Sequence, residues 1–350
     1  MKISIIGAGI VGMSTAYHLN KQGADVTIYE KDRAFAESSF ARSCGGFRSQ
    51  FFTETNIDMS RYSVDFIKNQ TDVDFVGNGY LMLFDTSKEQ DCNYSYKLQT
   101  SKGASTKLLT PEETAQRFPF LNTKDLYMSC MTNDESEGWI DPVSLHKWYR
   151  ENTNCKIIFN DGTLVDHDDA DAVVITSGCW SGDVGKHFDI NIPVIPHKHT
   201  VFNVSTTKPV IKELPLVADL ITGVYLRPEG EGYIVGYDGN GSYDSDDLEP
   251  DWNSWEEVWM HLYHRFPNIF DEAKMTGAWA GYYDQSKIDN NAIIDKNDKF
   301  YFATGFTGRG LMHSPAVGLT LSQMVLGEDL LFDISEYKID RTPNIEKYVI

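Results

Sequence analysis

The sequence is poor in cysteine, in long apolar runs and in basic residues, and each shortage excludes a class of protein. Five cysteines in 350 residues, widely spaced and without a C-x-x-C pair, predict neither a disulfide framework nor a zinc site. No run approaches the roughly 18 consecutive apolar residues of a membrane span. Lys and Arg number 31 against 51 Asp and Glu, and the net charge of -20 disfavours nucleic acid and anionic membranes as partners.

The start of the chain and its acidic clusters add two further exclusions. The first predicted strand starts at residue 2, which leaves no room for a signal peptide, so we expect a cytoplasmic protein with reduced thiols. The clusters 166–169 and 244–247 lack the ligand spacing of a calcium loop, so no metal site is expected. With 41% hydrophobic residues the chain can bury a substantial core, and we expect two structural lobes.

The N-terminal segment has the pattern of a βαβ unit that binds a dinucleotide. A strand over 2–6 leads into Gly7, Gly9 and Gly12 with the spacing G-x-G-x-x-G, and a helix and a strand over 25–29 follow. The first glycine permits the tight turn, the second lets the backbone approach a pyrophosphate, and the third lets helix and strand pack closely. Glu30 ends the second strand, where an acid accepts hydrogen bonds from a ribose 2′-hydroxyl and disfavours the 2′-phosphate of NADP. The motif alone leaves NAD and FAD open.

A second strand, glycine turn and helix lie at the other end of the chain. The strand over 300–304 runs into Gly305, Gly308 and Gly310, and a helix is expected over 314–326. A nicotinamide dehydrogenase places its second half soon after the first, whereas here distant segments have to meet around one ligand. A long ligand that reaches both turns, FAD, is therefore favoured over NAD.

The predicted elements give an α/β fold with two discontinuous domains. A Rossmann-like FAD-binding domain is expected from 1–75, 137–190 and 280–350, and a substrate domain with a mainly antiparallel sheet from 76–136 and 191–279. Helices are expected over 56–68, from Pro111, over 142–150 and over 254–266, and strands over 79–84, 200–204, 223–226 and 233–237. The segment 171–178 reads as an apolar strand that ends in a small-residue turn, which is typical of a buried parallel strand.

Seven motifs, in this order, resemble the FAD-dependent amino-acid and amine oxidoreductases, a family that includes D-amino acid oxidase, glycine oxidase, sarcosine oxidase and dimethylglycine dehydrogenase. They are the opening glycines with Glu30, 43–48 (SCGGFR), 79–81 (GYL), 138–142 (GWIDP), 176–181 (TSGCWS), 279–282 (WAGY) and 303–310 (ATGFTGRG). None is decisive alone, but the order is specific. The resemblance covers essentially the whole chain.

The resemblance implies which residues contact FAD. The opening turn would hold the pyrophosphate, Glu30 the adenosine ribose, and the last glycine turn would lie along the isoalloxazine edge, where N–H groups at a helix start stabilise negative charge upon reduction. The implied contacts are Gly7, Gly9, Ile10, Val11, Gly12, Glu30, Lys31, Ser38, Ser39, Arg42, Ser43, Gly45, Gly46, Ser177, Gly178, Trp180, Gly281, Gly305, Gly308, Arg309, Gly310, Leu311 and Met312. Sarcosine oxidase ties FAD to a cysteine before the last glycine turn, and the segment 281–284 has none, so noncovalent FAD is expected.

The resemblance also implies the chemistry. Members of this family remove a hydride equivalent from a carbon that bears an amine and form an imine, so the site has to orient the substrate against the flavin. A substrate carboxylate needs a cation, preferably the fork of an arginine. Arg48 matches an active-site arginine of sarcosine oxidase, Arg227 is a second candidate, and Tyr225 can hydrogen-bond the amine or the carboxylate. His197 and His199 share one face of a predicted strand; one of them could reach the site, but a surface position is the expectation for both.

Two departures limit what can be carried over from sarcosine oxidase. Met312 stands where that enzyme has a carboxylate-binding lysine, so the substrate clamp or the substrate differs. Ile234 stands, by rough matching, near the position of an oxygen-activating lysine, which favours a dehydrogenase over an oxidase. The expected substrate is a sarcosine-, dimethylglycine- or proline-like amine, and the electron acceptor (oxygen, a quinone or an electron-transfer protein) stays open. A flavin-binding assembly or chaperone-like protein without catalysis is the alternative.

Overall fold

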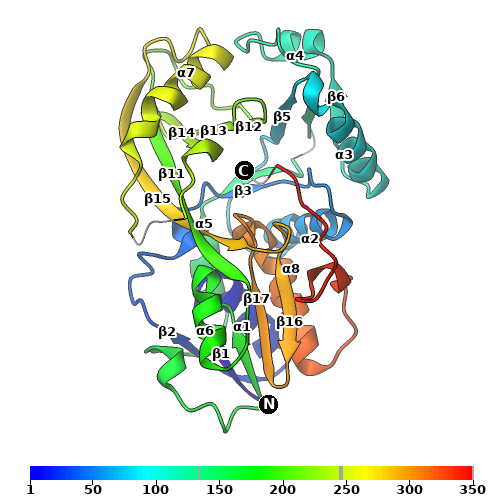
Figure 1. Ribbon diagram of the computed structural model, residues 1–350, viewed down its shortest axis with the longest axis vertical. Coiled ribbons are helices and arrows are strands. Elements are labelled where there is room, and N and C mark those ends of the chain that lie inside the picture. Colours follow the sequence, from blue (N-terminus) through cyan, green and yellow to red (C-terminus); the bar gives the residue numbers. More distant parts are fainter. Residues whose placement is uncertain (133–134, 244–246, 349–350) are drawn as a thin grey trace.

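The computed structural model describes residues 1–132, 135–243 and 247–348, so 244–246 of the second acidic cluster lie outside the described residues. Two large sheets divide the molecule into a lower and an upper half (Figure 1). The lower sheet has six strands in the spatial order β16 (Ile293–Asn297), β17 (Phe300–Thr304), β10 (Ala172–Ile175), β1 (Lys2–Ile6), β2 (Asp25–Glu30) and β9 (Lys156–Phe159). All neighbours in it are parallel except β16 and β17. The parallel strand predicted within 171–178 is thus confirmed, as β10 in the centre of the sheet.

Helices cover the lower sheet and bring the two ends of the chain together. The helices of this half are α1 (Ile10–Lys21), α2 (Glu54–Gln70), α5 (Pro142–Glu151), α6 (Ser181–His187) and α8 (Gly310–Leu326). The helix of the first glycine turn, α1, packs directly on the helix of the last one, α8. A Cβ built on Gly318 would lie 2.1 Å from the Ser14 hydroxyl, so only glycine allows this approach.

The upper sheet is mainly antiparallel. Its eight strands are, in spatial order, β15 (Lys274–Ser286), β11 (Val194–Ser205), β14 (Gly232–Tyr237), β13 (Val224–Glu229), β12 (Leu216–Asp219), β5 (Tyr80–Phe84), β7 (Met128–Met131) and β6 (Lys107–Leu109). Only β12 and β5 run parallel among the described pairs. Around it lie α3 (Glu89–Ser101), α4 (Pro111–Arg117) and α7 (Trp255–Arg265), and a small sheet of β3 (Gly46–Phe47), β8 (Gly138–Ile140) and β4 (Phe75–Val76) completes the fold.

This architecture confirms the predicted α/β class with a parallel and a mainly antiparallel sheet. The predicted helices and strands are present, and α4 has the full capping box between Thr110 and Glu113. The predicted domain boundaries stay a prediction, because β15 is a single continuous strand that crosses the boundary expected at 279/280.

One boundary is wrong. The last helix, α8, begins at Gly310 rather than at Ser314, and Pro315 lies inside it. Proline lacks the N–H that would bond the carbonyl of Leu311, but the Ser314 hydroxyl donates to that carbonyl at 2.8 Å. Because the Ser314 hydroxyl donates in place of the missing proline N–H, the helix can start at the glycine turn.

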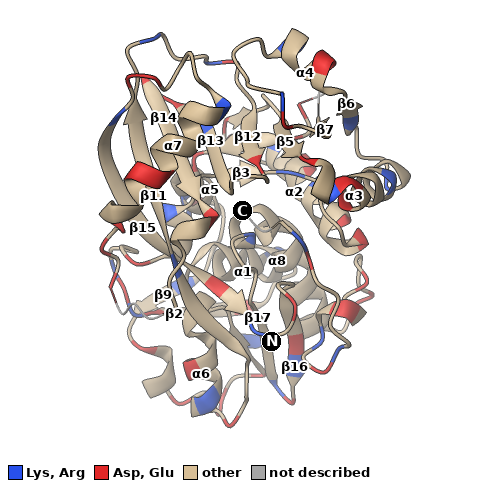
Figure 2. Cartoon of the chain, turned by 45° about the horizontal axis from the view of Figure 1, so that its top comes forward, with Lys and Arg blue, Asp and Glu red and all other residues tan. Residues whose placement is uncertain are grey.

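The surface reflects the acidic composition. Asp and Glu are found in both halves, around α3 and α4 as well as near α6 and β16 (Figure 2). Within the described part of the chain, no helix is long and apolar enough to cross a membrane.

Candidate active site

Both glycine turns line one cavity of about 420 Å³. Most of the residues expected to contact FAD line it: Gly7, Gly9, Ile10, Val11, Glu30, Lys31, Ser38, Ser39, Arg42, Ser43, Gly46, Ser177, Gly178, Trp180, Gly281, Gly308, Gly310, Leu311 and Met312, as does the candidate catalytic residue Tyr225. Outside its lining lie Gly12, Gly45, Arg48, Arg227, Gly305 and Arg309. Segments from the two ends of the chain thus meet around one elongated space.

The first glycine turn has the geometry of a dinucleotide cradle. Gly7 has a φ of +103°, which favours glycine, and a Cβ on Gly9 would meet no atom within 4 Å, so its backbone borders open space. A Cβ on Gly12 would lie 2.0 Å from the carbonyl oxygen of Gly7, which explains why this glycine shapes the turn without lining the cavity. The N-terminus of α1 then faces the cavity with its partial positive charge.

At the end of the cavity where the ribose is expected, hydrogen bonds fix the side chain of Glu30. One carboxylate oxygen of Glu30 accepts the N–H of Ala8 at 2.8 Å and the other the N–H of Asp32 at 2.9 Å, which fixes the side chain and leaves lone pairs toward the cavity. The Lys31 ammonium lies 4.2 Å from the ring centroid of Trp180. Both residues line the cavity, so an aromatic ring and a cation stand beside the expected position of the adenosine.

The opposite end is lined by three tyrosines, each packed against a glycine. A Cβ on Gly46 would lie 1.8 Å from the Tyr80 hydroxyl, one on Gly236 would lie 2.0 Å from the Tyr225 ring, and one on Gly308 would lie 2.8 Å from the Tyr283 ring. No larger residue fits at these glycines while the rings keep their places. The glycines therefore decide where the phenol groups stand.

These phenols and a neighbouring thiol are neutral. The Tyr225 hydroxyl hydrogen-bonds Tyr283 and Cys44. Burial raises the pKa of Tyr283 to about 12 and that of the Cys44 thiol to about 11. This end of the cavity can therefore donate and accept hydrogen bonds without carrying charge.

The surface position expected for His199 is wrong. Its ring lines the cavity and stacks on Tyr283 with centroids 4.2 Å apart, and burial lowers its pKa to about 3. Its Nε2 lies 3.0 Å from Nδ1 of His197, which is half-buried and stacked on Tyr243. The alternation of the strand put both rings on one face, but which face meets the cavity depends on how β11 pairs with β15.

Arg48 lies behind the tyrosines and not in the cavity wall. Its guanidinium donates to the carbonyls of Gln50 and Tyr348, the latter at 3.0 Å, and covers the Phe51 ring at 4.2 Å. Tyr80 and Tyr283, both cavity residues, lie near this guanidinium. Arg48 is thus separated from the cavity by one layer of side chains.

Arg309 also lies near the Phe51 ring, 5.9 Å from its centroid. It donates to the carbonyl of Asn290, while its Nε and Nη1 have no partner among the described residues. Burial lowers the pKa of both Arg48 and Arg309. Within the described part of the chain neither has a carboxylate within 4.0 Å, whereas the buried Arg265 and Arg341 each do.

Arg227 lies outside the cavity and contacts residues of its wall. Its Nε donates to the carbonyl of Cys44 at 2.8 Å, its Nη1 pairs with Glu229, and it covers Trp139 at 5.2 Å. It lines a second cavity, which shares Ser43 with the first. The guanidinium thus steadies the segment 43–46 but does not face the first cavity.

Sequence reasoning missed several residues at this site, among them Tyr80, Tyr283, Cys44 and Asp284. Asp284 lies in the cavity wall, and its carboxylate accepts the backbone N–H groups of Gly305 and Phe306. Burial raises its pKa to about 6. The motif 279–282 ends two residues before Asp284, so the sequence marked this part of the chain but not the direction of its side chains.

A nucleotide cradle and a second glycine turn on one cavity define a dinucleotide-binding oxidoreductase of two-sheet architecture. The model of the FAD-dependent oxidoreductase family (DAO) matches residues 2–324, and the chain belongs to this family. Its cofactor is therefore FAD, and the open cradle at Gly9 and the oriented Glu30 fit that group.

The relatives include proteins without a stated reaction and enzymes that act on amines. FAD-dependent oxidoreductase domain-containing protein 1 of Bos taurus is 30% identical over 93% of this chain and 81% of its own length. Mitochondrial dimethylglycine dehydrogenase of Homo sapiens is 26% identical over 96% of this chain but only 44% of its own length. The solved L-proline dehydrogenase from P. horikoshii has a TM-score of 0.85 and 26% identity, with 96% of each chain covered.

Proposed function

We propose that this protein oxidises the C–N bond of a carboxylate-bearing amine, such as an amino acid or an N-methylated glycine, to an imine. The observation that carries the proposal is the end of the cavity opposite the nucleotide cradle, where neutral tyrosines stand in front of two buried arginines without a carboxylate in contact. A buried cation without a carboxylate in contact is costly, and an anionic ligand is a natural complement. The dimethylglycine and L-proline dehydrogenases among the similar proteins support the same substrate class.

The chain supplies binding and orientation, and FAD supplies the acceptor of the hydride. Residues of the first glycine turn with α1, Glu30 and Lys31 would hold the pyrophosphate and the adenosine. The start of α8 at Gly310 would place its free N–H groups along the isoalloxazine edge.

At the substrate end, Tyr225 and Tyr283 would orient the amine through their hydroxyls and exclude water. Met312 lines the cavity in place of a lysine, so the carboxylate clamp of this proposal is Arg48. Arg48 would reach a carboxylate when Tyr80 or Tyr283 shifts by a side-chain rotation. A planar fork suits a carboxylate better than a point charge does.

A dehydrogenase is the form we propose, but not on the ground of Ile234. That residue lies on β14 and lines the second cavity, so it says nothing about oxygen near the flavin end of the first. The support comes from the dehydrogenases among the relatives. The cytoplasmic location expected from the sequence stays a prediction, because the dimethylglycine dehydrogenases are mitochondrial proteins by name.

The test is anaerobic reduction of the purified flavoprotein by a panel of sarcosine, N,N-dimethylglycine, L-proline and common amino acids. Loss of the visible flavin absorbance with a carboxylate-bearing amine is expected, and repetition in air and with a quinone separates oxidase from dehydrogenase. If no amine reduces the flavin and Arg48 variants keep their biological activity, the chain is the non-catalytic flavin-binding alternative.

A further inference from the structure

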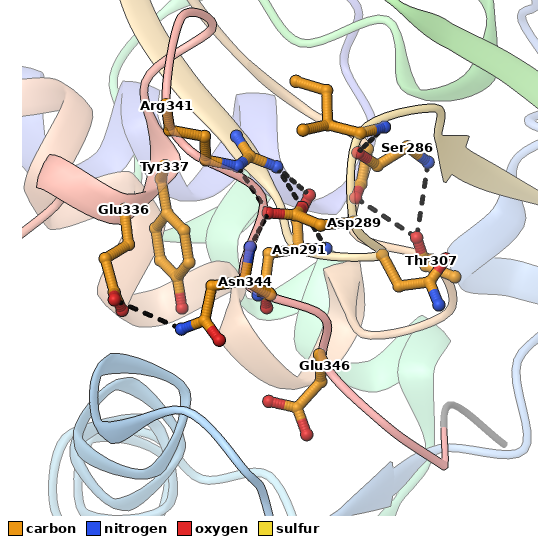
Figure 3. A network of polar contacts seen from close by, with 12 residues as sticks. Ser286, Asp289, Asn291, Thr307, Glu336, Tyr337, Arg341, Asn344 and Glu346 are labelled. Atoms are coloured by element: carbon orange, nitrogen blue, oxygen red, sulfur yellow. Dashed lines mark hydrogen bonds and ion pairs between the residues drawn. The ribbon is translucent and has the colours of Figure 1, made fainter.

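The last described segment of the chain, Arg341 to Tyr348, crosses the outside of the site and lies beyond the residues 2–324 that the family model matches. It has no regular secondary structure, yet Figure 3 shows side chains from this segment and from the loop after β15 converging on one another. We call residues 341–348 the C-terminal strap. Its contacts connect it to both of the buried arginines at the end of the cavity.

The first anchor of the strap is Asp289. Arg341 donates to both of its carboxylate oxygens, at 2.9 and 2.5 Å, and the N–H of Asn344 adds a third bond at 2.9 Å. Both side chains of the ion pair are buried, with exposed fractions of 2% and 0%. Asn291 donates to the carbonyl of Asn344 at 2.6 Å. The loop that the strap grips in this way supplies the Asn290 carbonyl to Arg309.

The second anchor is Glu346, whose side chain is fully buried. Its carboxylate accepts the N–H groups of Phe52 and Thr53 at 2.9 and 3.1 Å, the Thr53 hydroxyl, and the Asn56 amide at 2.8 Å. Thr53 is the N-cap residue of α2 and caps nothing with its own side chain. A carboxylate from the far end of the chain thus accepts the N-cap N–H of α2 and holds the segment that follows Arg48.

The third contact is made with Arg48 itself. The carbonyl of Tyr348 accepts from Arg48 Nη2 across 300 positions of sequence, and the Tyr348 hydroxyl is fixed by Asp91 at 2.7 Å. The charge of Glu346 acts on both Arg48 and Arg309. The strap thus holds Arg48 directly and Arg309 through the loop after β15.

We infer that Glu346 is a positioning residue of the substrate carboxylate site: it fixes the segment 48–53 and the strap so that the Arg48 guanidinium stands at the end of the cavity. The inference rests on the proposed function, because it takes Arg48 as the carboxylate clamp. Four hydrogen bonds to one buried carboxylate connect the C-terminal strap, which lies beyond the residues 2–324 that the family model matches, to the segment that follows Arg48.

Three roles of Glu346 predict different changes in the affinity for a carboxylate when Glu346 is replaced. As a positioning residue, its loss displaces Arg48 and weakens the binding of a carboxylate. As a mere counter-charge, its neutralisation removes a competing negative charge near the two arginines and tightens that binding. As a mere helix cap, its loss lowers stability and leaves the affinity unchanged.

The experiment titrates the FAD-loaded protein with anthranilate and with its neutral amide, and follows the perturbation of the flavin spectrum, together with thermal unfolding. In Glu346→Gln, the amide oxygen can still accept, but the NH2 group replaces one carboxylate oxygen and faces donors that it cannot accept from. We expect anthranilate to bind at least about tenfold more weakly while the neutral amide is unaffected. Glu346→Asp should recover part of the loss. Glu336→Gln, the same change at an exposed partner of Asn344, is the matched control and should bind as the wild type does.

An unchanged or tighter anthranilate affinity in Glu346→Gln overturns the inference, as does an equal loss for the neutral amide. Arg48→Lys separates this result from the proposed function. If Arg48→Lys weakens anthranilate and Glu346→Gln does not, only the positioning role fails. If Arg48→Lys changes nothing, or anthranilate leaves the wild-type spectrum unperturbed, the carboxylate clamp fails and the inference with it.

Discussion

The buried Arg265 of the upper half and the buried arginines beside the cavity have opposite surroundings. In the upper half Arg265 is bound by Asp219 at 2.8 Å and by Asp125 at 2.8 Å, so its charge is compensated inside the protein. At the cavity, Arg48 and Arg309 meet backbone carbonyls and the Phe51 ring, and Arg309 keeps two nitrogens without a partner in the described structure. A protein that pairs Arg265 and Arg341 with carboxylates and leaves Arg48 and Arg309 without one in contact separates structural charges from charges available to a ligand.

The largest expected effect is on the free energy of unfolding, and it differs between Arg265 in the upper half and Arg48 at the cavity. Arg265→Met removes the partner of the buried Asp219 and should lower the free energy of unfolding by about 3–5 kcal/mol. Arg48→Met leaves only two carbonyls unsatisfied and should cost about 1–3 kcal/mol. Denaturant unfolding of both variants measures the difference. Equal losses would mean that Arg48 is as structural as Arg265.

The next effect is on ligand binding and concerns the cavity alone. Arg48→Lys keeps the charge but loses the planar fork, so a carboxylate ligand should bind about 10- to 100-fold more weakly, while FAD content is retained. The flavin-to-protein ratio and the affinity for the substrate found in the amine panel check the two parts. Arg265→Lys is the control, since its partners lie far from the cavity lining and its affinity should not change.

A third prediction tests whether the tyrosine end is as tightly built as the ion pairs. Gly236→Ala places a methyl group 2.0 Å from the Tyr225 ring, so the ring must move, and we expect a loss of about 1–3 kcal/mol in stability with impaired turnover. Gly277→Ala on β15 is the matched control, because its nearest neighbouring atom lies 3.6 Å away. Wild-type turnover in Gly236→Ala would show that Tyr225 does not orient the substrate.

The first half of the site could be predicted from sequence because it is local. The turn Gly7–Gly12 and Glu30 belong to one βαβ unit, and their spacing determines their positions. The tyrosine end could not be predicted in the same way. Tyr80 lies on β5, paired with β12, and Tyr283 on β15, paired with β11, so the direction of each ring depends on partners far along the chain. The burial of Arg48 likewise depends on Tyr348, 300 positions away.

The smallest expected effect concerns a carboxylate that, unlike Asp219, has no cation within 4.0 Å in the described structure. Burial raises the pKa of Asp284 from 3.8 to about 6, so the folded protein holds this proton over a range where the unfolded chain has lost it. Its contribution to stability is therefore complete below about pH 3.8 and is lost as the pH rises through about 6. Asp284→Asn should flatten the pH dependence of unfolding between these values, which denaturant unfolding at several pH values measures. If the variant kept the wild-type slope, Asp284 would not hold its proton in the folded protein, and a buried carboxylate without a cation in contact would be compensated by its hydrogen-bond donors instead.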